Sequence, residues 1–357
     1  MKLIQTLLLL PILSFGQTIT TLTSLNTINS ESSGLLYLDN RIITHNDSGG
    51  EAVLYEIDSI NGEITRKVII ENASNIDWED ICSDENSIYI GDVGNNIGNR
   101  IDLKIYKIAI DDYYNNDTVV AEIINFEYAD QIDFSNQLYT TNYDAEALIS
   151  YGDSLYLFSK NWGNTNSLIY TIPKSPGNYI VNTIDTLINT GLVTGATLNP
   201  ITNEVLLTSY NLVNASIIEL KNFHSGLFSN GIMSKYNINT SASHQIEAIC
   251  SISDTEHQLA AESNNSGEAS LYKLISNSVA IQELKTKVLI FPNPTSNLIY
   301  INAKEQLQFE IYTITGELIL SCNESPIDVS TLPSSVYILK YSELNSNLYK
   351  SHRICVK

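Results

Sequence analysis

Short apolar stretches of strand length recur between polar, turn-forming residues along most of the chain. Four such stretches follow one another closely at 145–150, 154–159, 167–173 and 179–187. Turn-forming pairs such as Asn61-Gly62 separate the stretches, and β-branched and aromatic residues, including 21 tyrosines, are abundant. The pattern predicts an all-β protein built from short antiparallel strands.

One five-residue pattern recurs at the start of such strand groups. It usually has an acid first, a Glu, Ser or Thr third, a small or acidic residue fourth and an apolar residue fifth. The third positions are Ser33, Glu79, Glu146, Thr194 and Glu247, which lie 46, 67, 48 and 53 residues apart. Repeats of this length with four strands each are typical of β-propellers. The sequence therefore predicts five blades, or six if one copy has lost its signature.

Two segments depart from the regular spacing. We interpret the 67-residue interval as one blade with an insertion around Asp111–Asn116, because the stretch Val119–Phe126 is needed to complete the second blade. A separate strand is expected at Thr18–Leu25, where no repeated pattern precedes it. We expect it to complete the last blade, so that no long strand edge is left exposed.

Polar side chains are expected to gather at one mouth of the propeller channel. The repeated pattern contributes acids at its first position, and a second row of polar residues follows where the next strand of each copy ends. The candidate ligand-binding residues at this mouth are Glu31, Asp47, Asp77, Asp92, Asp144, Lys160 and Glu262.

The glutamates at the third position are the candidate metal ligands. Glu79, Glu146 and Glu247 would repel one another near a common axis unless a cation or a basic residue compensates. Ligand sets made only of oxygen suit Ca²⁺ or Mg²⁺ rather than zinc or a redox metal. The alternative is structural, with acids of the pattern accepting backbone N–H bonds between blades. Lys160 would then pair with Glu146, or else bind an anionic group of a ligand.

Catalytic signatures are missing from the sequence: it contains no Gly-x-Ser-x-Gly, His-Glu-x-x-His, P-loop or Cys-x-x-Cys motif. No catalytic residue is therefore predicted. The five histidines are scattered along the chain, and a single histidine beside a loop is more typical of a surface hydrogen bond than of a general base.

The two ends and the charge define the organisation of the chain. Residues 1–16 have the Lys2, apolar run and small residue of a secretory signal peptide, and no later stretch is apolar enough for a membrane helix. Residues 17–284 hold 34 acidic and 11 basic side chains, whereas residues 285–357 hold 6 and 7. We expect a propeller at 17–284 and a second domain at 285–357. The acidic surface argues against nucleic acid as a partner.

The repeat region resembles a known group of proteins. Its residues are Ser33-Gly34-Leu35, the run from His45 to Gly49, Asp77-Trp78-Glu79-Asp80-Ile81, and the run from Gly91 to Asn96 with Arg100. They are similar to secreted bacterial β-propellers related to the phytase-like and SdiA-regulated propellers. The resemblance implies the fold. It does not imply phytase activity, because the acid-rich and arginine motifs of the calcium-dependent phytases are missing.

The C-terminal region resembles a sorting module. Phe291-Pro292-Asn293-Pro294, the strand Phe309–Ile314 leading into Thr315-Gly316-Glu317, Ile327–Pro333, and Val336–Leu339 are similar to the type A sorting domain of the type IX (Por) secretion system of Bacteroidetes. Ser335 stands where that family usually has Gly. The alternating strands predict a small Ig-like sandwich. The resemblance implies handling by the type IX machinery, passage through the outer membrane, and release or anchoring at the cell surface.

Three functional hypotheses follow. The first is an extracellular propeller that binds a ligand or a divalent cation, calcium in particular, at the channel mouth. The second is a metal-dependent hydrolase of phosphoester or ester bonds, in which Glu79, Glu146 and Glu247 hold the cation and Lys160 steadies the anion. The third is a scaffold that binds other proteins through its loops.

Overall fold

The structure is a computed structural model that describes residues 18–211, 214–238, 245–264, 267–276, 288–303, 307–343 and 349–357. The chain divides into two compact units, one up to Asn277 and one from Ser278. The expected signal peptide and the expected boundary at residues 284 and 285 lie outside the described residues. Among the described residues, no helix is long and apolar enough to cross a membrane.

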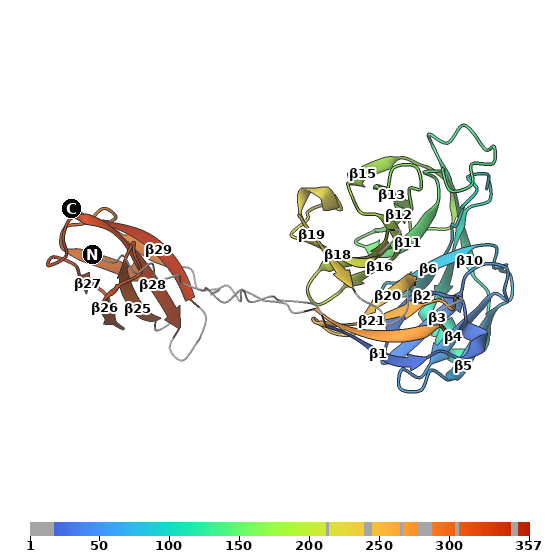
Figure 1. Cartoon of the computed structure of the whole chain (residues 1–357), viewed down its shortest axis with the longest axis horizontal. Helices are drawn as coiled ribbons and strands as arrows, with labels where there is room; N and C mark the ends of the chain where they lie inside the picture. The colour runs from blue at the N-terminus through green and yellow to red at the C-terminus, as the bar shows by residue number, and fades with distance from the viewer. Residues whose placement is uncertain are drawn as a thin grey trace, which may run out of the picture. The chain divides into compact units, whose positions relative to one another are not determined.

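The described residues of the N-terminal unit form five separate sheets, as five blades require (Figure 1). The first sheet contains, in spatial order, β2 (Ser32–Leu38), β3 (Arg41–Asn46), β4 (Val53–Ile57), β5 (Ile64–Ile70) and β9 (Thr118–Val119). The second contains β6 (Trp78–Ser83), β7 (Ser87–Asp92), β8 (Lys104–Ala109), β10 (Glu122–Tyr128) and β14 (Gly177–Val181). The third contains β11 (Ala145–Tyr151), β12 (Ser154–Ser159), β13 (Ser167–Pro173) and β15 (Thr183–Leu187).

Each of the two remaining sheets has four strands. The fourth sheet contains β16 (Leu192–Asn199), β17 (Glu204–Tyr210), β18 (Ala215–Lys221) and β19 (Ile232–Ile238). The fifth contains β20 (Ile246–Ser251), β21 (Glu256–Ala261), β22 (Ser270–Ile275) and β1 (Thr18–Ser24). The first strand of the chain therefore completes the last sheet, antiparallel to β22, as predicted.

The innermost strands meet around a common centre, where Figure 1 labels all five of them. They contact one another in the cyclic order β2, β6, β11, β16, β20 and back to β2. Each of these strands begins at one copy of the repeated pattern. The fold class predicted from the sequence, an all-β propeller of five blades, is confirmed.

Two strands extend the sheet of a neighbouring blade, which the sequence did not predict. β9 pairs in parallel with β5 of the first sheet, and β14 pairs in parallel with β10 of the second sheet. The stretches at 119–126 and 179–187, each expected to be a single strand, are consequently divided between two sheets. The expected insertion is the short helix α1 (Ile110–Asn115), whose Tyr113 is fully buried.

The core lies between adjacent sheets. β7 is buried at all six positions because both of its faces pack on other parts of the protein. Trp78 of β6 is fully buried in the cluster between the first and second sheets, where it packs with Leu54, Ile90 and Tyr106. Strands covered on both faces lose their polar alternation, which explains the nearly continuous apolar runs in the sequence.

The C-terminal unit is a small sandwich of two antiparallel sheets. One sheet contains β23 (Leu289–Phe291), β24 (Leu298–Asn302) and β27 (Ile327–Asp328). The other contains β26 (Leu318–Cys322), β25 (Leu307–Thr313), β28 (Ser335–Glu343) and β29 (Tyr349–Val356). Ile299 of the first sheet and Phe309 and Leu339 of the second pack in one core.

The N-terminal unit also contains two short 3₁₀ turns, η1 (Thr27–Asn29) and η2 (Phe228–Asn230).

Candidate functional site at the channel mouth

The repeated sequence pattern is a β-bulge that occurs in every innermost strand. The pairing register shifts by one residue between the second and fourth positions of all five copies. The extra residue is the third position in each case: Ser33, Glu79, Glu146, Thr194 and Glu247. A bulge bends its strand and redirects one side chain. The five bulges thus supply five side chains at equivalent places of one ring.

The two hydroxyl residues of this ring join neighbouring blades. Ser33 Oγ donates to the carbonyl oxygen of Glu79 at 2.8 Å, and Thr194 Oγ1 donates to the carbonyl oxygen of Ile246 at 2.7 Å. Both side chains are buried. They satisfy backbone carbonyl groups at the seam between inner strands. The structural alternative predicted from the sequence was a different one, in which acids of the pattern accept backbone N–H groups.

The three glutamates of the ring instead line a cavity of about 310 Å³. Its remaining walls come from the ends of the second strands, from the loops that follow them, and from residues that precede two innermost strands, Tyr139 before β11 and Gln245 before β20. The lining residues are Ser33, Asp47, Glu79, Asn96, Tyr139, Glu146, Lys160, Trp162, Tyr210, Gln245, Glu247 and Glu262. The cavity therefore combines five carboxyl groups, one ammonium group and three aromatic rings.

Carboxyl groups converge at this mouth in two sets that share Glu79. Oxygen atoms of Asp47, Asp77 and Glu79 lie within 4.8 Å of one another, and so do oxygen atoms of Glu79, Asp144 and Glu146. Of the predicted metal ligands, Glu79 and Glu146 come together in the second set. Glu247 lines the same cavity but belongs to neither set.

Crowding in a buried place raises the pKa of these acids. Burial and then the charges of Asp77 and Glu247 raise the pKa of Asp47 to about 7. Burial and the charge of Asp144 raise the pKa of Asp77 to about 6. Burial, reinforced by Glu146, raises the pKa of Glu79 well above its ordinary value. A bound cation would favour the charged forms and remove this electrostatic cost.

Glu247 and Glu262 form the fifth-blade side of the cavity. Burial raises the pKa of each to about 8, with Lys160 opposing the shift in both cases. Glu247 is only 5 % exposed, and its Oε1 has no hydrogen-bond partner among the described residues. A buried carboxylate oxygen without a partner is costly, and this atom is available to accept a hydrogen bond from a group that enters the cavity.

Lys160 is bound by the protein itself. Its Nζ lies 2.6 Å from both carboxylate oxygens of Glu146, and it sits over the rings of Trp162 and Tyr210 at 5.0 and 5.4 Å from their centroids. Burial lowers the pKa of Lys160, but the charges of Glu146 and Glu247 outweigh burial and raise it well above its ordinary value. The ammonium group is therefore a permanent internal charge that neutralises part of the acidic cluster.

Three of the predicted mouth residues have hydrogen bonds or exposure that the sequence did not predict. Asp92 is buried and accepts hydrogen bonds from Arg100 Nη2 at 2.8 Å and from the backbone N–H of Asp77 at 3.2 Å, and it does not line the cavity. Glu31 is exposed and also lies outside the cavity lining. Asp144 accepts hydrogen bonds from the backbone N–H of Asn95 at 2.6 Å and from Trp162 Nε1 at 2.8 Å.

Asp80 performs the structural task that was expected of some acids in the pattern, because it accepts backbone N–H groups of other blades. Its Oδ2 accepts the backbone N–H groups of Leu148 at 2.8 Å and Ala196 at 3.0 Å, and its Oδ1 accepts that of Ile81 at 2.9 Å. This fully buried carboxyl group thus links β6, β11 and β16. The sequence gives one sign of this special role: Asp80 is an acid at the fourth position of its copy, where the other copies have Gly or Ala.

Gly94 lies directly behind Glu79, the residue that the two carboxylate sets share. A Cβ atom at Gly94 would stand 2.1 Å from Glu79 Oε1 and 2.5 Å from Asp77 Oδ2. Only glycine allows the loop after β7 to approach both carboxyl groups this closely.

Aromatic residues at the mouth were missed at the sequence level. Tyr139 lies in the loop before β11, and its ring is 4.8 Å from that of Trp162. Tyr210 ends β17. Their sequence signal is weak, because each is a single aromatic residue near the end of a strand or in a long connection.

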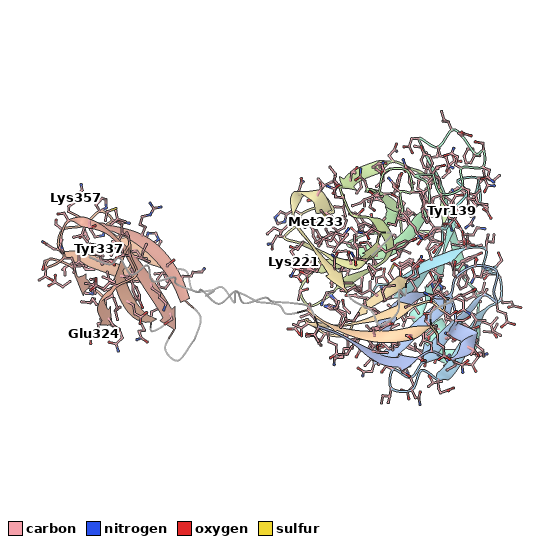
Figure 2. The ribbon with its side chains drawn as sticks, in the orientation of Figure 1. Tyr139, Lys221, Met233, Glu324, Tyr337 and Lys357 are labelled. Carbon is pink, nitrogen blue, oxygen red and sulfur yellow. The ribbon has the colours of Figure 1, made fainter. Side chains whose placement is uncertain are left out.

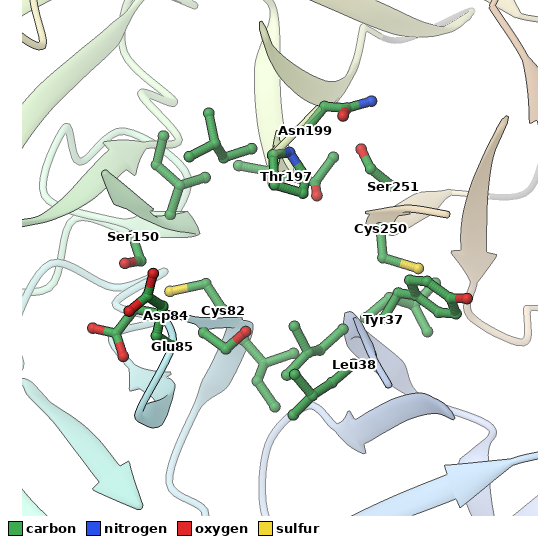
Figure 3. A pocket seen from close by; sticks show the side chains of 18 of the residues that line it. Tyr37, Leu38, Cys82, Asp84, Glu85, Ser150, Thr197, Asn199, Cys250 and Ser251 are labelled. Atoms are coloured by element: carbon green, nitrogen blue, oxygen red, sulfur yellow. The ribbon is translucent and has the colours of Figure 1, made fainter. Parts of the chain in front are cut away.

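A second and larger cavity of about 900 Å³ opens at the other end of the innermost strands (Figure 3). Its walls are mainly apolar residues of the inner strands, such as Leu38 and Leu198, with Asp84 and Lys174 at the edge. Cys82 and Cys250 lie on separate sides of it as free thiols, and burial raises the pKa of both. No cluster of potential metal ligands was found there among the described residues.

Comparison with known protein families identifies the C-terminal unit. Residues 289–357 match the family described as a secretion system C-terminal sorting domain. The C-terminal unit is a sorting domain. Domains of this family mark proteins that the type IX system exports to the cell surface or beyond, so the predicted localisation and handling by that machinery are confirmed. The match covers the sandwich and does not extend to the propeller.

Comparison of the whole chain finds solved structures of low similarity. No curated protein matches the sequence significantly. Among similar solved structures, Ycf48 bound to D1 peptide has 13 % identity and a TM-score of 0.32, with 96 % of each chain covered. A quinoprotein alcohol dehydrogenase-like protein from Bacteroides thetaiotaomicron has 11 % identity and a TM-score of 0.32, with 84 % of this chain and 66 % of that chain covered.

A third similar structure is an exo-β-1,3-galactanase from Phanerochaete chrysosporium. It has 8 % identity and a TM-score of 0.46, with 96 % of this chain and 94 % of that chain covered. Similarities of this size give no information about ligands or activity. The phytase-like family suggested by the sequence is not confirmed by any of these comparisons.

Proposed function

We propose that the protein is an exported propeller that binds Ca²⁺ at its channel mouth, through Asp47, Asp77, Glu79, Asp144 and Glu146. The observation behind this proposal is the convergence of these carboxyl groups in two sets that share Glu79. Bulges in β6 and β11 bring Glu79 and Glu146 to the same place from neighbouring blades.

The spacing of the carboxyl oxygens suits calcium. Two ligands bound to one Ca²⁺ lie about 2.3 to 2.6 Å from the ion, so they can be at most about 5 Å apart. The oxygens of each set lie within 4.8 Å of one another. Among the described residues, these two sets consist of carboxylates without an imidazole or a thiolate, which favours a hard cation over zinc. Mg²⁺ requires a tighter octahedral arrangement and is expected to bind more weakly.

The hydrolase hypothesis has less support. In that hypothesis Lys160 binds the anion. In the structure, however, the ammonium group of Lys160 is already bound by both carboxylate oxygens of Glu146. The cavity has five carboxyl groups against one lysine, so a phosphate group would meet net repulsion. We therefore favour binding over phosphoester hydrolysis.

Calcium titration of chelator-treated protein tests the proposal. We expect heat of binding and a higher melting temperature with CaCl₂, because the ion binds the native state and relieves repulsion among the carboxylates. Glu79→Gln removes the ligand common to both sets and should weaken binding at least about tenfold, or about 1.4 kcal/mol. Glu85→Gln, an exposed acid at the opposite cavity, is the matched control. Absence of heat and of any thermal shift in the unmodified protein would contradict the proposal.

A further inference from the structure

Resting on the cation site proposed above, we infer that the mouth binds a neutral saccharide, with Tyr139 as the surface on which a sugar ring stacks. The inference names the ligand class of this site. It depends on the exposure and backbone conformation of Tyr139, on its connection to the acidic cluster, and on the charge of the cavity.

Tyr139 is held in an unusual backbone conformation. Its φ is 54°, in the left-handed region that a bulky side chain rarely adopts. Its N–H donates to the carbonyl oxygen of Asn96 at 3.3 Å, and the neighbouring Gln137 N–H donates to that of Ile97 at 2.8 Å. Such conformations occur often at ligand-binding sites, where surrounding structure enforces them. The loop before β11 is thus fastened to the loop after β7 in a way that presents Tyr139.

The ring of Tyr139 remains available to a ligand. It is 57 % exposed although it lines the cavity, and it is labelled in Figure 2. It contacts Trp162, whose Nε1 donates to Asp144, a proposed calcium ligand. Lys160 lies over the ring of Trp162, so Tyr139 is the more accessible of these two aromatic side chains. A ligand on Tyr139 would therefore lie beside the cation site.

The polar walls fit hydroxyl groups rather than charged groups. Five carboxyl groups disfavour an anionic ligand, whereas the Oε1 of Glu247 is a buried acceptor without a partner among the described residues. Asn96 and Gln245 add amide donors and acceptors to the same cavity. A sugar combines an apolar ring face with hydroxyl groups that can bind carboxylates, amides and a calcium ion. The volume of about 310 Å³ is at the lower end of small-ligand sites, which suits the end of a glycan.

An organic cation is the main competing ligand. Acids beside aromatic rings attract ammonium groups through charge and cation–π contact. In this cavity, however, Lys160 already occupies the space between Glu146, Trp162 and Tyr210. The exposed ring of Tyr139 adjoins the calcium ligands, where a second cation would be repelled once the metal is bound.

The test is binding of the full-length protein, loaded with calcium, to an array of neutral glycans, with calorimetry on the strongest hit. Tyr139→Gly should reduce glycan affinity at least tenfold, since glycine accepts φ 54° and the ring alone is lost. Tyr139→Phe should retain affinity. Tyr236→Ala removes an exposed tyrosine on the edge strand β19 and should have no effect.

The outcomes separate this inference from the cation proposal. Calcium affinity should be unchanged in Tyr139→Gly, because Tyr139 is not a ligand of the ion. Calcium binding without binding of any neutral glycan would overturn the saccharide inference and leave the cation proposal intact. Equal glycan affinity of Tyr139→Gly and the unmodified protein would also overturn it, as would preference for lysine-rich peptides over glycans. Glycan binding without calcium binding would support the saccharide and contradict the cation proposal.

Discussion

Single buried polar residues determine how the blades are joined. Asp80 is fully buried, and it accepts three backbone N–H groups from three innermost strands. Burial raises the pKa of Asp80 well above its ordinary value, while the three backbone bonds oppose that rise. No packed apolar side chain could replace it, because the three N–H groups would then have no acceptor.

Asp80→Ala should therefore be strongly destabilising. Leaving buried N–H groups unsatisfied costs about 1 to 3 kcal/mol for each group, so we expect a loss of about 3 kcal/mol or more in the free energy of unfolding. Urea denaturation followed by tryptophan fluorescence would measure it. Asp153→Ala, an exposed acid, should change the free energy by less than about 0.5 kcal/mol. Equal stability of the two variants would show that the three bonds contribute little.

His257 gives a pH-dependent prediction outside the lining of the mouth cavity. It is 1 % exposed, and its ring nitrogens lie 3.1 Å from the hydroxyls of Ser251 and Ser276. Burial, aided by the charge of Lys221, lowers the pKa of His257 from 6.5 to about 4. Between these two values the unfolded chain binds a proton that the folded protein does not, so stability falls as the pH falls.

The matching variant is His257→Gln, which cannot titrate. As the pH falls from about 7 to about 4, the free energy of unfolding of the unmodified protein should decrease by up to about 3 kcal/mol more than that of the variant. Denaturation at several pH values would measure the difference. A constant difference between the two proteins over this range would contradict the shifted pKa.

At the scale of elements, the β-bulge is the unit that generates the site. All five innermost strands have it at the same position, yet just three copies place a carboxylate there. The acidic site is consequently one-sided: its two carboxylate sets come from the first three blades, while Glu247 and Glu262 line the fifth-blade wall. Loops after the second strands complete it, since Asp47 and Gly94 both follow such strands.

Gly94→Ala tests how the loop after β7 supports the cation site. The added methyl group would meet Glu79 and Asp77, so we expect both carboxyl groups to move and calcium affinity to fall at least about tenfold. The measurement is calcium titration by calorimetry. Gly50→Ala is the matched control, because its Cβ would find no heavy atom closer than 4.0 Å. Unchanged calcium affinity of Gly94→Ala would argue against Glu79 and Asp77 as ligands.

At the scale of the whole molecule, the two units have separate tasks. The propeller holds nearly all the net negative charge and the candidate site, whereas the sandwich matches a sorting domain. Each unit has its own hydrophobic core. The division implies that export and binding can be altered independently.

Deletion of residues 289–357 should block export while the propeller stays folded. In a host with a type IX system, we expect the truncated protein to accumulate inside the cell envelope, because the signal for outer-membrane passage is gone. Immunoblots of cell and culture fractions would show it. Glu79→Gln in the full-length chain is the control and should be exported normally. Normal export of the truncated chain would contradict the sorting role.

The sequence by itself predicted the repeat, a propeller of five or six blades, the strand that completes the last sheet and the sorting domain. These features depend on local periodicity and on short motifs, which a single sequence contains. It also predicted that Glu79, Glu146 and Glu247 lie near one axis, because equivalent positions of the blades face one centre, and two of the three, Glu79 and Glu146, share a carboxylate set.

The tertiary structure decided which acids meet and which do not. Asp92 pairs with Arg100, and Lys160 pairs with Glu146. Asp80, and not a glutamate of the pattern, accepts the backbone N–H groups that join the innermost strands. Tyr139 reaches the mouth through a loop fixed by bonds to a distant segment. Likewise, β9 and β14 join neighbouring sheets. Such contacts depend on distances and directions between segments far apart in the chain, and local sequence patterns do not contain that information.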